Sequence, residues 1–307
     1  MKVFVNGATG VLGKAAVARL VADGHEVTGV ARSKEKARLL WDLGVTPVVL
    51  DPFDRAALHA AVVGHEVVCN LATHIPKVSK GWRSSAWADN DRIRTELSAS
   101  LVDVALETGA ARYVQESITF PYPERGDEWI DETVPIEPTP YVRSVLDAEG
   151  AAARFTAGGG AGVVLRFAAF YGPDSHTTQD TVRAARRGLG ALPGAPDAWA
   201  SSIHTDDAGA AVAAAMRVPA GVYNVADDEP VTRAEYSRVI AEALGRRVRH
   251  VGGVVSRLGG SKAEAISRSQ RISNRRLRDA SGWSPMFPSV REGLPPVVAA
   301  IVGSTDA

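Results

Sequence analysis

Short apolar runs alternate with longer amphipathic stretches along the first half of the chain. The runs are rich in valine and predict buried strands at residues 2–5, 26–31, 45–50, 65–70, 111–116 and 162–167. Between them, apolar residues recur at helical spacing and predict helices at about 11–20, 34–43, 55–63, 91–108 and 141–156. This alternation predicts an α/β fold built on a doubly wound parallel sheet, with ligands beyond the carboxyl ends of the strands.

The first strand runs directly into a glycine-rich turn and then a helix. In such a turn one glycine allows a sharp bend, one lets the backbone approach a pyrophosphate, and one lets the helix pack closely on the strand. The helix N-terminus offers free N–H groups and a positive dipole end to phosphates. We therefore predict a dinucleotide site whose contacts come from Gly7, Thr9, Gly10, Val11, Leu12 and Gly13.

The ends of the other strands carry residues that suit the rest of such a cofactor. Arg32 and Ser33 follow the second strand, where arginine accommodates a 2′-phosphate, so we expect NADP, with NAD as the alternative. Asp51, followed by Pro52, ends the third strand, and its carboxylate suits an adenine amino group. Further cofactor contacts are expected from Leu71, Ala72, Thr73, Tyr141 and Phe167.

Beyond residue 171 the pattern loosens into shorter elements. It predicts helices at about 178–188 and 233–245, strands at 201–204 and 222–226, and an alanine-rich helix that Asp206 and Asp207 cap. Thr139 and Pro140 are expected to cap and open the helix at 141–156. We expect residues 1–171 to form a dinucleotide-binding domain and residues 172–307 a smaller α+β substrate domain, with 201–226 returning to the first.

Composition narrows the partners of the protein. The formal net charge is zero over 307 residues, so no overall basic field indicates nucleic acid or an anionic membrane surface as a partner. Cys69 is the single cysteine, which excludes an internal disulfide and indicates a core thiol in a reducing compartment. No apolar run approaches the roughly 20 residues of a membrane span, and the seven histidines are scattered without metal-ligand spacing. We expect a cytoplasmic protein without a metal.

Several motifs in chain order resemble the extended short-chain dehydrogenase/reductases, also called the epimerase/dehydratase type. They are GATGVLG at 7–13, LDPFD at 50–54, NLA at 70–72, LRFAAFYGP at 165–173, SIHTDDAGAA at 202–211, GVYNVADDEP at 221–230 and RISNRRLRDASGW at 271–283. The resemblance implies a Rossmann-type domain with a smaller substrate-binding domain. It also implies a homodimer formed through the helices at 91–108 and 141–156.

The sequence departs from this family at its catalytic motif. The family uses a tyrosine followed four residues later by a lysine, and the resemblance places that pair at Tyr141 and Val145, so the lysine is absent. The family's serine or threonine falls on Ile118, with Ser117 and Thr119 on either side as candidates. A tyrosine without help has a pKa of about 10 and is a weak base at neutral pH. As a proton donor Tyr141 is still usable, which favours carbonyl reduction over alcohol oxidation.

These observations predict an oxidoreductase or epimerase acting on a small carbonyl, alcohol or sugar-like substrate, and they leave alternatives open. His74 or Lys77 could partly replace the lysine. The fold could instead perform a non-redox isomerisation, elimination or cyclisation with Tyr141, Ser117 or His204, or serve as a cofactor-binding regulator without catalysis. The arginines at 268–278 either grip an anionic substrate or lie on a solvated helix after Ser273. Candidate substrate contacts are His74, Phe120, Tyr122, Tyr171 and His204.

Overall fold

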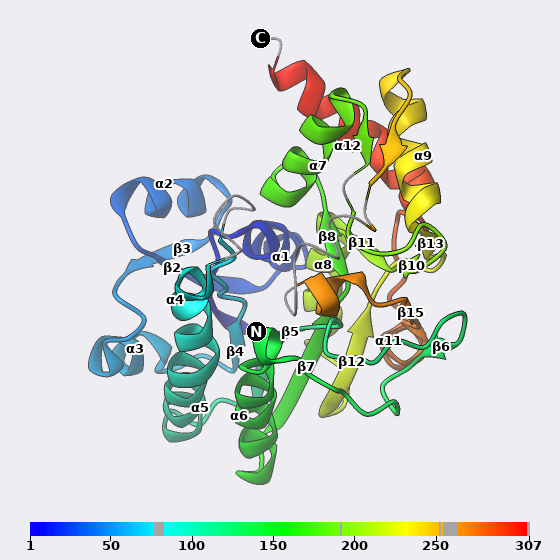
Figure 1. Cartoon of the computed structure of the whole chain (residues 1–307). Helices are drawn as coiled ribbons and strands as arrows, with labels where there is room; N and C mark the ends of the chain where they lie inside the picture. Colours follow the sequence, from blue (N-terminus) through cyan, green and yellow to red (C-terminus); the bar gives the residue numbers. More distant parts are fainter. Residues whose placement is uncertain (77–82, 191, 252, 254–262, 306–307) are drawn as a thin grey trace.

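The computed structural model describes residues 1–76, 83–190, 192–251, 253 and 263–305. A seven-stranded parallel sheet lies at its centre, with the strand order β12-β7-β5-β4-β1-β2-β3 (Figure 1). The strands are β1 (Lys2–Asn6), β2 (Glu26–Ala31), β3 (Thr46–Val49), β4 (Val67–Asn70), β5 (Arg112–Ile118), β7 (Ala161–Phe167) and β12 (Gly221–Val225). The predicted doubly wound parallel sheet is confirmed.

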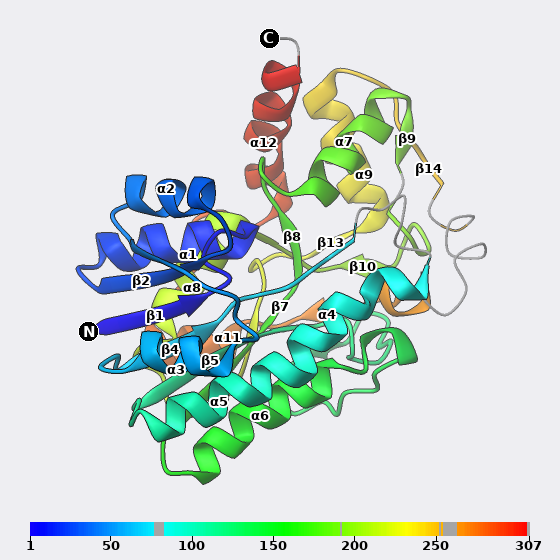
Figure 2. The same ribbon diagram turned by 90° about the vertical axis from the view of Figure 1, so that its left-hand side faces the viewer.

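Helices cover both faces of the sheet, as Figure 2 shows. Alternate residues of one strand face opposite layers: Val3 and Val5 of β1 pack in one core, and Phe4 between them packs in the other. The helices of the first layer are α1 (Val11–Ala22), α2 (Lys34–Asp42) and α8 (Thr205–Ala214). Those of the second are α3 (Arg55–Val62), α5 (Ser98–Glu107) and α6 (Val145–Ala157). Because both faces are covered, the central strands β1, β4, β5 and β7 are buried along most of their length.

The segment predicted as one helix at 91–108 is a compound helix. It consists of a 3₁₀ turn η1 (Ser84–Trp87), α4 (Ala88–Arg92), a π-helical turn η2 (Ile93–Leu97) and α5. A π turn widens a helix and is often found at functional sites. The π turn therefore makes this compound helix a candidate part of the functional site.

The helix predicted to begin at Tyr141 begins later. A 3₁₀ turn, η3 (Pro140–Val142), comes first, and α6 starts only at Val145. Thr139 makes no capping bond, and its buried hydroxyl has no hydrogen-bond partner within the described ranges. Ser144 instead donates a hydrogen bond of 2.8 Å to Asp91, so a tertiary contact holds the chain where the local pattern predicted a continuous helix.

A second, smaller group of elements has its own apolar core, formed by residues of α7, α9 and α12 with Tyr171 and Val231. These helices lie together at the end of the molecule that carries the C-terminus (Figure 1). The helices of this group are α7 (His176–Arg186), α9 (Arg233–Leu244) and α12 (Val290–Thr305), whereas α11 (Arg275–Ser281) packs against β12 and its Leu277 belongs to a core of the central sheet. Short strands connect them: β6 (Trp129–Ile130), β8 (Ala169–Tyr171), β9 (Leu189–Gly190), β10 (Trp199–Ala200), β11 (Ser202–His204), β13 (Val231–Thr232), β14 (Arg249–His250) and β15 (Arg271–Ile272).

Within residues 201–226, α8 packs on α1 and β12 pairs with β7 at the edge of the central sheet. The chain therefore passes from the small group of helices back to the large sheet and out again. None of the helices in the described part of the chain is long and apolar enough to cross a membrane.

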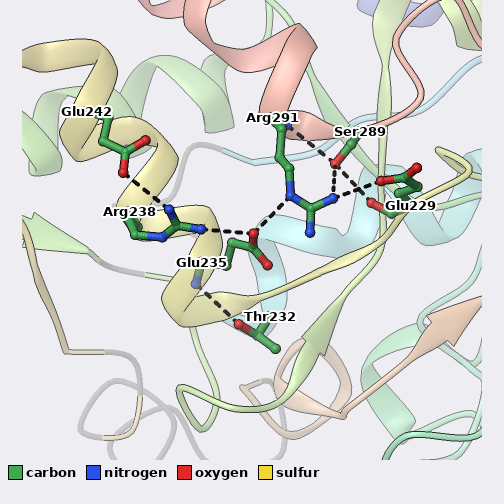
Figure 3. A network of polar contacts seen from close by, with 7 residues as sticks. All are labelled: Glu229, Thr232, Glu235, Arg238, Glu242, Ser289 and Arg291. Carbon is green, nitrogen blue, oxygen red and sulfur yellow. Dashed lines mark hydrogen bonds and ion pairs between the residues drawn. The ribbon is translucent and has the colours of Figure 1, made fainter.

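An ion-pair network joins α9 to the start of α12 (Figure 3). Arg291 donates to Glu235 at 2.9 Å and to Glu229 at 3.0 Å, and Arg238 bonds the same Glu235 at 3.0 Å. The hydrogen bond from Arg291 is the main cause that holds the pKa of Glu235 below its ordinary value. A carboxylate with a lowered pKa in the folded state stabilises the fold above its unfolded pKa, and that stability is lost as the pH falls through the folded pKa.

We expect Arg291→Met to lower the free energy of unfolding by about 0.5–1 kcal/mol at pH 7, because the pair is partly exposed. The difference from the parent protein should shrink as the pH falls through the lowered pKa of Glu235 in the folded state. Urea unfolding at several pH values measures both effects. Arg275→Met is the matched control, since Arg275 pairs only with Asp279 within its own helix. A deficit that is the same at every pH would contradict the assignment.

Candidate functional site

The glycine turn after β1 is shaped by two close backbone approaches. Gly7 has a φ of +84°, and a Cβ on it would lie 2.5 Å from the backbone nitrogen of Ala72. A Cβ on Gly13 would lie 2.0 Å from the carbonyl oxygen of Gly7, so neither position admits a side chain. A Cβ on Gly10 would meet only the Gly7 oxygen, at 3.4 Å, which leaves open the space beside the turn.

The N-terminus of α1 behind this turn has no side-chain cap, and no acidic residue lies in its first turn. Its free N–H groups and positive dipole end are therefore available to an anion. Thr9, Val11 and Leu12 lie on the turn and the first residues of α1 beside Gly10. The residues present fit the pyrophosphate of a dinucleotide.

The other predicted cofactor residues differ in how freely they can contact a ligand. Arg32 is exposed directly after β2, whereas the Ser33 hydroxyl already accepts from the Lys36 backbone N–H as the N-cap of α2. Asp51 is exposed after β3 and accepts from the Phe53 N–H at 3.0 Å, with Pro52 half-buried beside it.

The predicted contacts at the ends of β4 and β7 also fall into two groups. Ala72 lies against the glycine turn and Thr73 beyond it is exposed, while Leu71 is buried. Phe167 is fully buried and packs against Phe170, with ring centroids 5.2 Å apart. The side chain of Phe167 therefore belongs to the core rather than to an open ligand surface.

Tyr141 lies in the η3 turn, half-buried, with its ring packed edge-on against Trp87 at 4.4 Å between centroids. Burial raises the pKa of its phenol above the ordinary value, the positive charge of Arg94 opposes this rise, and Asp91 adds to it. The net direction is upward, so Tyr141 is protonated at neutral pH. No hydrogen-bond partner of its hydroxyl lies among the described residues.

Val145, at the family's lysine position, is fully buried at the first residue of α6. The 3₁₀ turn ends at Val142 and α6 begins at Val145, while Arg143 and Ser144 between them keep right-handed helical backbone angles. The chain therefore offers no local cation to the phenol from this position.

The predicted catalytic role of Ser117 and the substrate role of Tyr122 both need correction. Ser117 is 1% exposed and donates to Glu149 at 2.6 Å. Arg166 donates two hydrogen bonds to the Glu149 carboxylate, at 2.8 and 2.6 Å, and a third to the Tyr122 hydroxyl at 2.8 Å. The Tyr122 hydroxyl in turn donates to the side-chain oxygen of Asn224 at 2.9 Å. Both hydroxyls belong to a buried chain of hydrogen bonds that joins α6 to β5, β7 and β12. The sequence around Ser117 could not predict this chain of hydrogen bonds, because its members come from four elements that are distant in sequence.

Thr119 is the predicted catalytic hydroxyl that this network does not use. Its backbone N–H donates to Phe167 at 3.0 Å and its carbonyl accepts from Tyr122 at 3.0 Å, just beyond β5. Among the described residues its hydroxyl makes no hydrogen bond. Phe120 is half-buried beside it. Thr119 is therefore the better candidate of the two hydroxyls at the end of β5.

His204 and Tyr171, predicted as substrate contacts, lie inside the protein. His204 is 5% exposed, its Nδ1 accepts from the Asp206 N–H at 3.2 Å, and it is thus the N-cap of α8. The expectation that Asp206 and Asp207 cap this helix was wrong. The His204 ring packs against Tyr171 at 5.2 Å and Phe287 at 4.5 Å, and burial lowers its pKa. Both residues serve packing and capping, a role that the spacing of the sequence does not distinguish from a pocket.

Of the residues that could replace the family's lysine, the structure describes only His74. His74 is exposed after β4, with its backbone N–H donating to Asn90 at 3.0 Å. Lys77 and Lys80 lie outside the described residues.

The arginine-rich stretch contributes to packing. Arg271 lies between two indole rings, 4.1 Å from the centroid of Trp129 and 4.5 Å from that of Trp199. Ser273 accepts from the Arg275 N–H at 3.4 Å, and α11 begins there. Arg271 is thus held by cation–π contacts.

A charged pair that the sequence analysis did not single out lies next to Tyr141. Arg94 is 3% exposed and pairs with Glu116, 2% exposed, at 3.3 Å to each carboxylate oxygen. A signal was present: Arg94 precedes Leu97 and Leu101 at helical spacing, so it falls on the apolar face of its helix. A charge on an apolar face needs a partner or a function.

The comparisons with known proteins agree with this architecture. The model of the NAD dependent epimerase/dehydratase family matches residues 3–226. A 3-diazoavenalumate denitrifying reductase from a Streptomyces species is 35% identical over 307 aligned positions, covering 96% of this chain and 99% of the relative. A 2-alkyl-3-oxoalkanoate reductase from Shewanella oneidensis is 28% identical over 79% of this chain and 66% of the relative. The chain belongs to the NAD-dependent epimerase/dehydratase family, the extended short-chain dehydrogenase/reductases.

Solved structures show the same fold. A UDP-glucose 4-epimerase from Thermotoga maritima, solved with UDP-glucose, has a TM-score of 0.81 at 19% identity and covers 99% of this chain and all of its own. A dTDP-glucose 4,6-dehydratase from Streptomyces venezuelae, solved with NAD, has a TM-score of 0.80 at 19% identity over 100% and 98%. At these identities the likeness is one of fold.

We expect Ser117→Ala to lower the free energy of unfolding by about 1 kcal/mol, because one buried hydrogen bond to Glu149 is lost. Turnover should stay within about twofold of the parent, since this hydroxyl faces α6 rather than the ligand. Thr119→Val is the comparison variant, and we expect it to lower turnover with little loss of stability. Thermal unfolding and steady-state rates measured on both variants check this. The assignment fails if Ser117→Ala abolishes turnover in a fully folded protein.

Proposed function

We propose that the protein is a reductase that uses NADP(H) to deliver hydride to an electrophilic carbon of a small organic molecule. The observation that carries this proposal is the protonated phenol of Tyr141, with fully buried Val145 at the lysine position. Oxidation of an alcohol needs a base that takes its proton, whereas reduction of a carbonyl needs an acid that gives one. A phenol that is protonated at neutral pH has a proton to give, but its raised pKa makes it a weak acid, so a nearby positive charge would help it to donate.

In this proposal the glycine turn holds the pyrophosphate, and bound NADPH supplies the hydride. As the carbonyl carbon receives the hydride, the C=O bond becomes a C–O single bond and its oxygen takes the proton of Tyr141. The product is the alcohol, and the phenolate recovers a proton from water. In this proposal Thr119 hydrogen-bonds the same oxygen, and the packing of the Trp87 ring against Tyr141 supports a fixed orientation of the phenol.

A second candidate within the same class is reductive loss of dinitrogen from a diazo compound. It is favoured by the match along almost the whole chain to a relative named a denitrifying reductase. For an aryl diazonium ion, the hydride bonds to the ring carbon, the C–N bond breaks and its electron pair leaves with N₂, so the charges balance without a proton. No oxyanion forms, so the reaction does not depend on a lysine or on a proton from Tyr141. The missing lysine and Ile118 in place of a hydroxyl suit this chemistry.

Tyr141→Phe distinguishes the two reactions. For a ketone we expect turnover to fall about 10²- to 10⁴-fold, because the proton donor is lost. For a diazo substrate we expect turnover to stay within a few-fold. The assay follows NADPH oxidation with ketones, an aryl diazo compound and UDP-glucose, and analyses the products, with N₂ measured from ¹⁵N-labelled diazo substrate. Turnover of any substrate without net cofactor oxidation would overturn the reductase proposal and favour a non-redox reaction.

The choice of NADP rests on Arg32, which is exposed at the carboxyl end of β2 with no acidic neighbour after Ala31. We expect Arg32→Ala to raise the KM for NADPH about tenfold or more, since a charge-assisted bond to the phosphate contributes about 1.5–3 kcal/mol. The KM for NADH should stay within about twofold. Arg19→Ala, in the last turn of α1, is the control. Equal weakening of both cofactors by Arg32→Ala would argue against a 2′-phosphate contact.

A further inference from the structure

A buried charge lies in the wall between the compound helix and the sheet. Arg94 comes from the π turn η2, and its partner Glu116 comes from β5, directly before Ser117. The Nε of Arg94 is buried and has no hydrogen-bond partner among the described residues. A buried ion pair is expensive to desolvate, and an apolar pair of the same size would serve packing at least as well.

Two contacts place Arg94 on the side of its helix that faces Tyr141. Asp91 lies three residues before Arg94, so the two share a helix face, and Asp91 accepts from Ser144 at 2.8 Å. Trp87, one turn earlier, packs on the Tyr141 ring at 4.4 Å. These contacts hold residues 141–144 against the face that carries Arg94. The η2 turn and α6 also lie side by side, as Figure 2 shows for the helical layer around α4, α5 and α6.

We propose that Arg94 is a positioning residue for Tyr141: from the neighbouring helix, its guanidinium supplies the fixed positive charge that position 145 lacks. Glu116 neutralises part of that charge and so sets how strongly the phenol feels it. The inference rests on the proposed function only for its use in turnover, where the phenolate left after proton donation faces Arg94. The arrangement itself is a property of the protein without cofactor or substrate.

The charged groups around the phenol act in opposite directions. The charge of Arg94 lowers the pKa of Tyr141, while burial and the carboxylate of Asp91 raise it. Burial also raises the pKa of Glu116, Arg94 opposes that rise, and Glu149 adds to it. Glu149 is in turn paired with Arg166. Within the described part of the chain, Arg94 is the charge that favours the ionised form of the Tyr141 phenol.

The test measures the acidity of the phenol directly. A fluorinated tyrosine, whose phenol is more acidic, is incorporated at position 141, and its titration is followed by fluorine NMR in the apo protein. We expect Arg94→Met to raise its pKa by about one unit, the low end of the about 1–3 units that a neighbouring opposite charge gives, because Glu116 neutralises part of the charge. Arg94→Lys should keep most of the original value. Glu116→Gln, which removes the neutralising carboxylate, should lower the pKa.

Arg92→Met is the matched control. Arg92 lies two residues away on the same helix, pairs with Glu96 and stacks on Phe53, so its loss should leave the titration unchanged. If Arg94→Met does not fold, the Glu116→Gln variant tests the proposal. It preserves the volume of the side chain, and the pKa of the phenol at position 141 should fall. The proposal is overturned if neither variant shifts the pKa, or if Glu116→Gln raises it. Because no cofactor or substrate is present, failure of the reductase assay leaves this measurement unaffected.

Discussion

The approach of three backbone segments at the end of β1 is the constraint on which the site depends. The Gly7 turn lies against the chain after β4, and Gly13 lets α1 lie against Gly7 itself. On its other side α1 receives α8, where a Cβ on Gly209 would come within 2.5 Å of the Ala15 backbone. The helix that presents its N-terminus to a phosphate is therefore also the anchor of the segment that returns from the small domain. A side chain at any of these glycines would move the anion site and the returning helix together.

Buried polar groups at the end of β5 divide into a structural set and a set near the phenol. A continuous chain of hydrogen bonds links α6 to the sheet, and its members in order are Ser117, Glu149, Arg166, Tyr122 and Asn224. Arg94 and Glu116 form a second pair on the adjacent side, toward Tyr141. In this protein the hydroxyl of Ser117 holds the helix that begins at Val145. The valine at position 145 thus stands beside a serine that bonds Glu149 of the same helix.

Much of the fold was readable from the sequence because it is set by local patterns. Apolar runs at 2–5 and 162–167, with amphipathic helices between the runs, are what a parallel sheet covered on both faces requires, and the structure has strands there. The glycine spacing at residues 7–13 predicted the close turn for the same local reason. The absence of the lysine was equally predictable, because the sequence has Val145 four residues after Tyr141.

The tertiary structure decided where the polar side chains point. Whether Ser117 faces a ligand or Glu149, and whether His204 lines a pocket or caps α8, depends on partners tens of residues away in the chain. The break between η3 and α6 arises from the bond between Ser144 and Asp91, which no local propensity encodes. Arg94 was visible only as a charge on an apolar helix face. Its relation to Tyr141 exists because two helices distant in sequence pack side by side. The sequence by itself therefore determined the glycine turn, and the tertiary structure determined which charge lies beside the phenol.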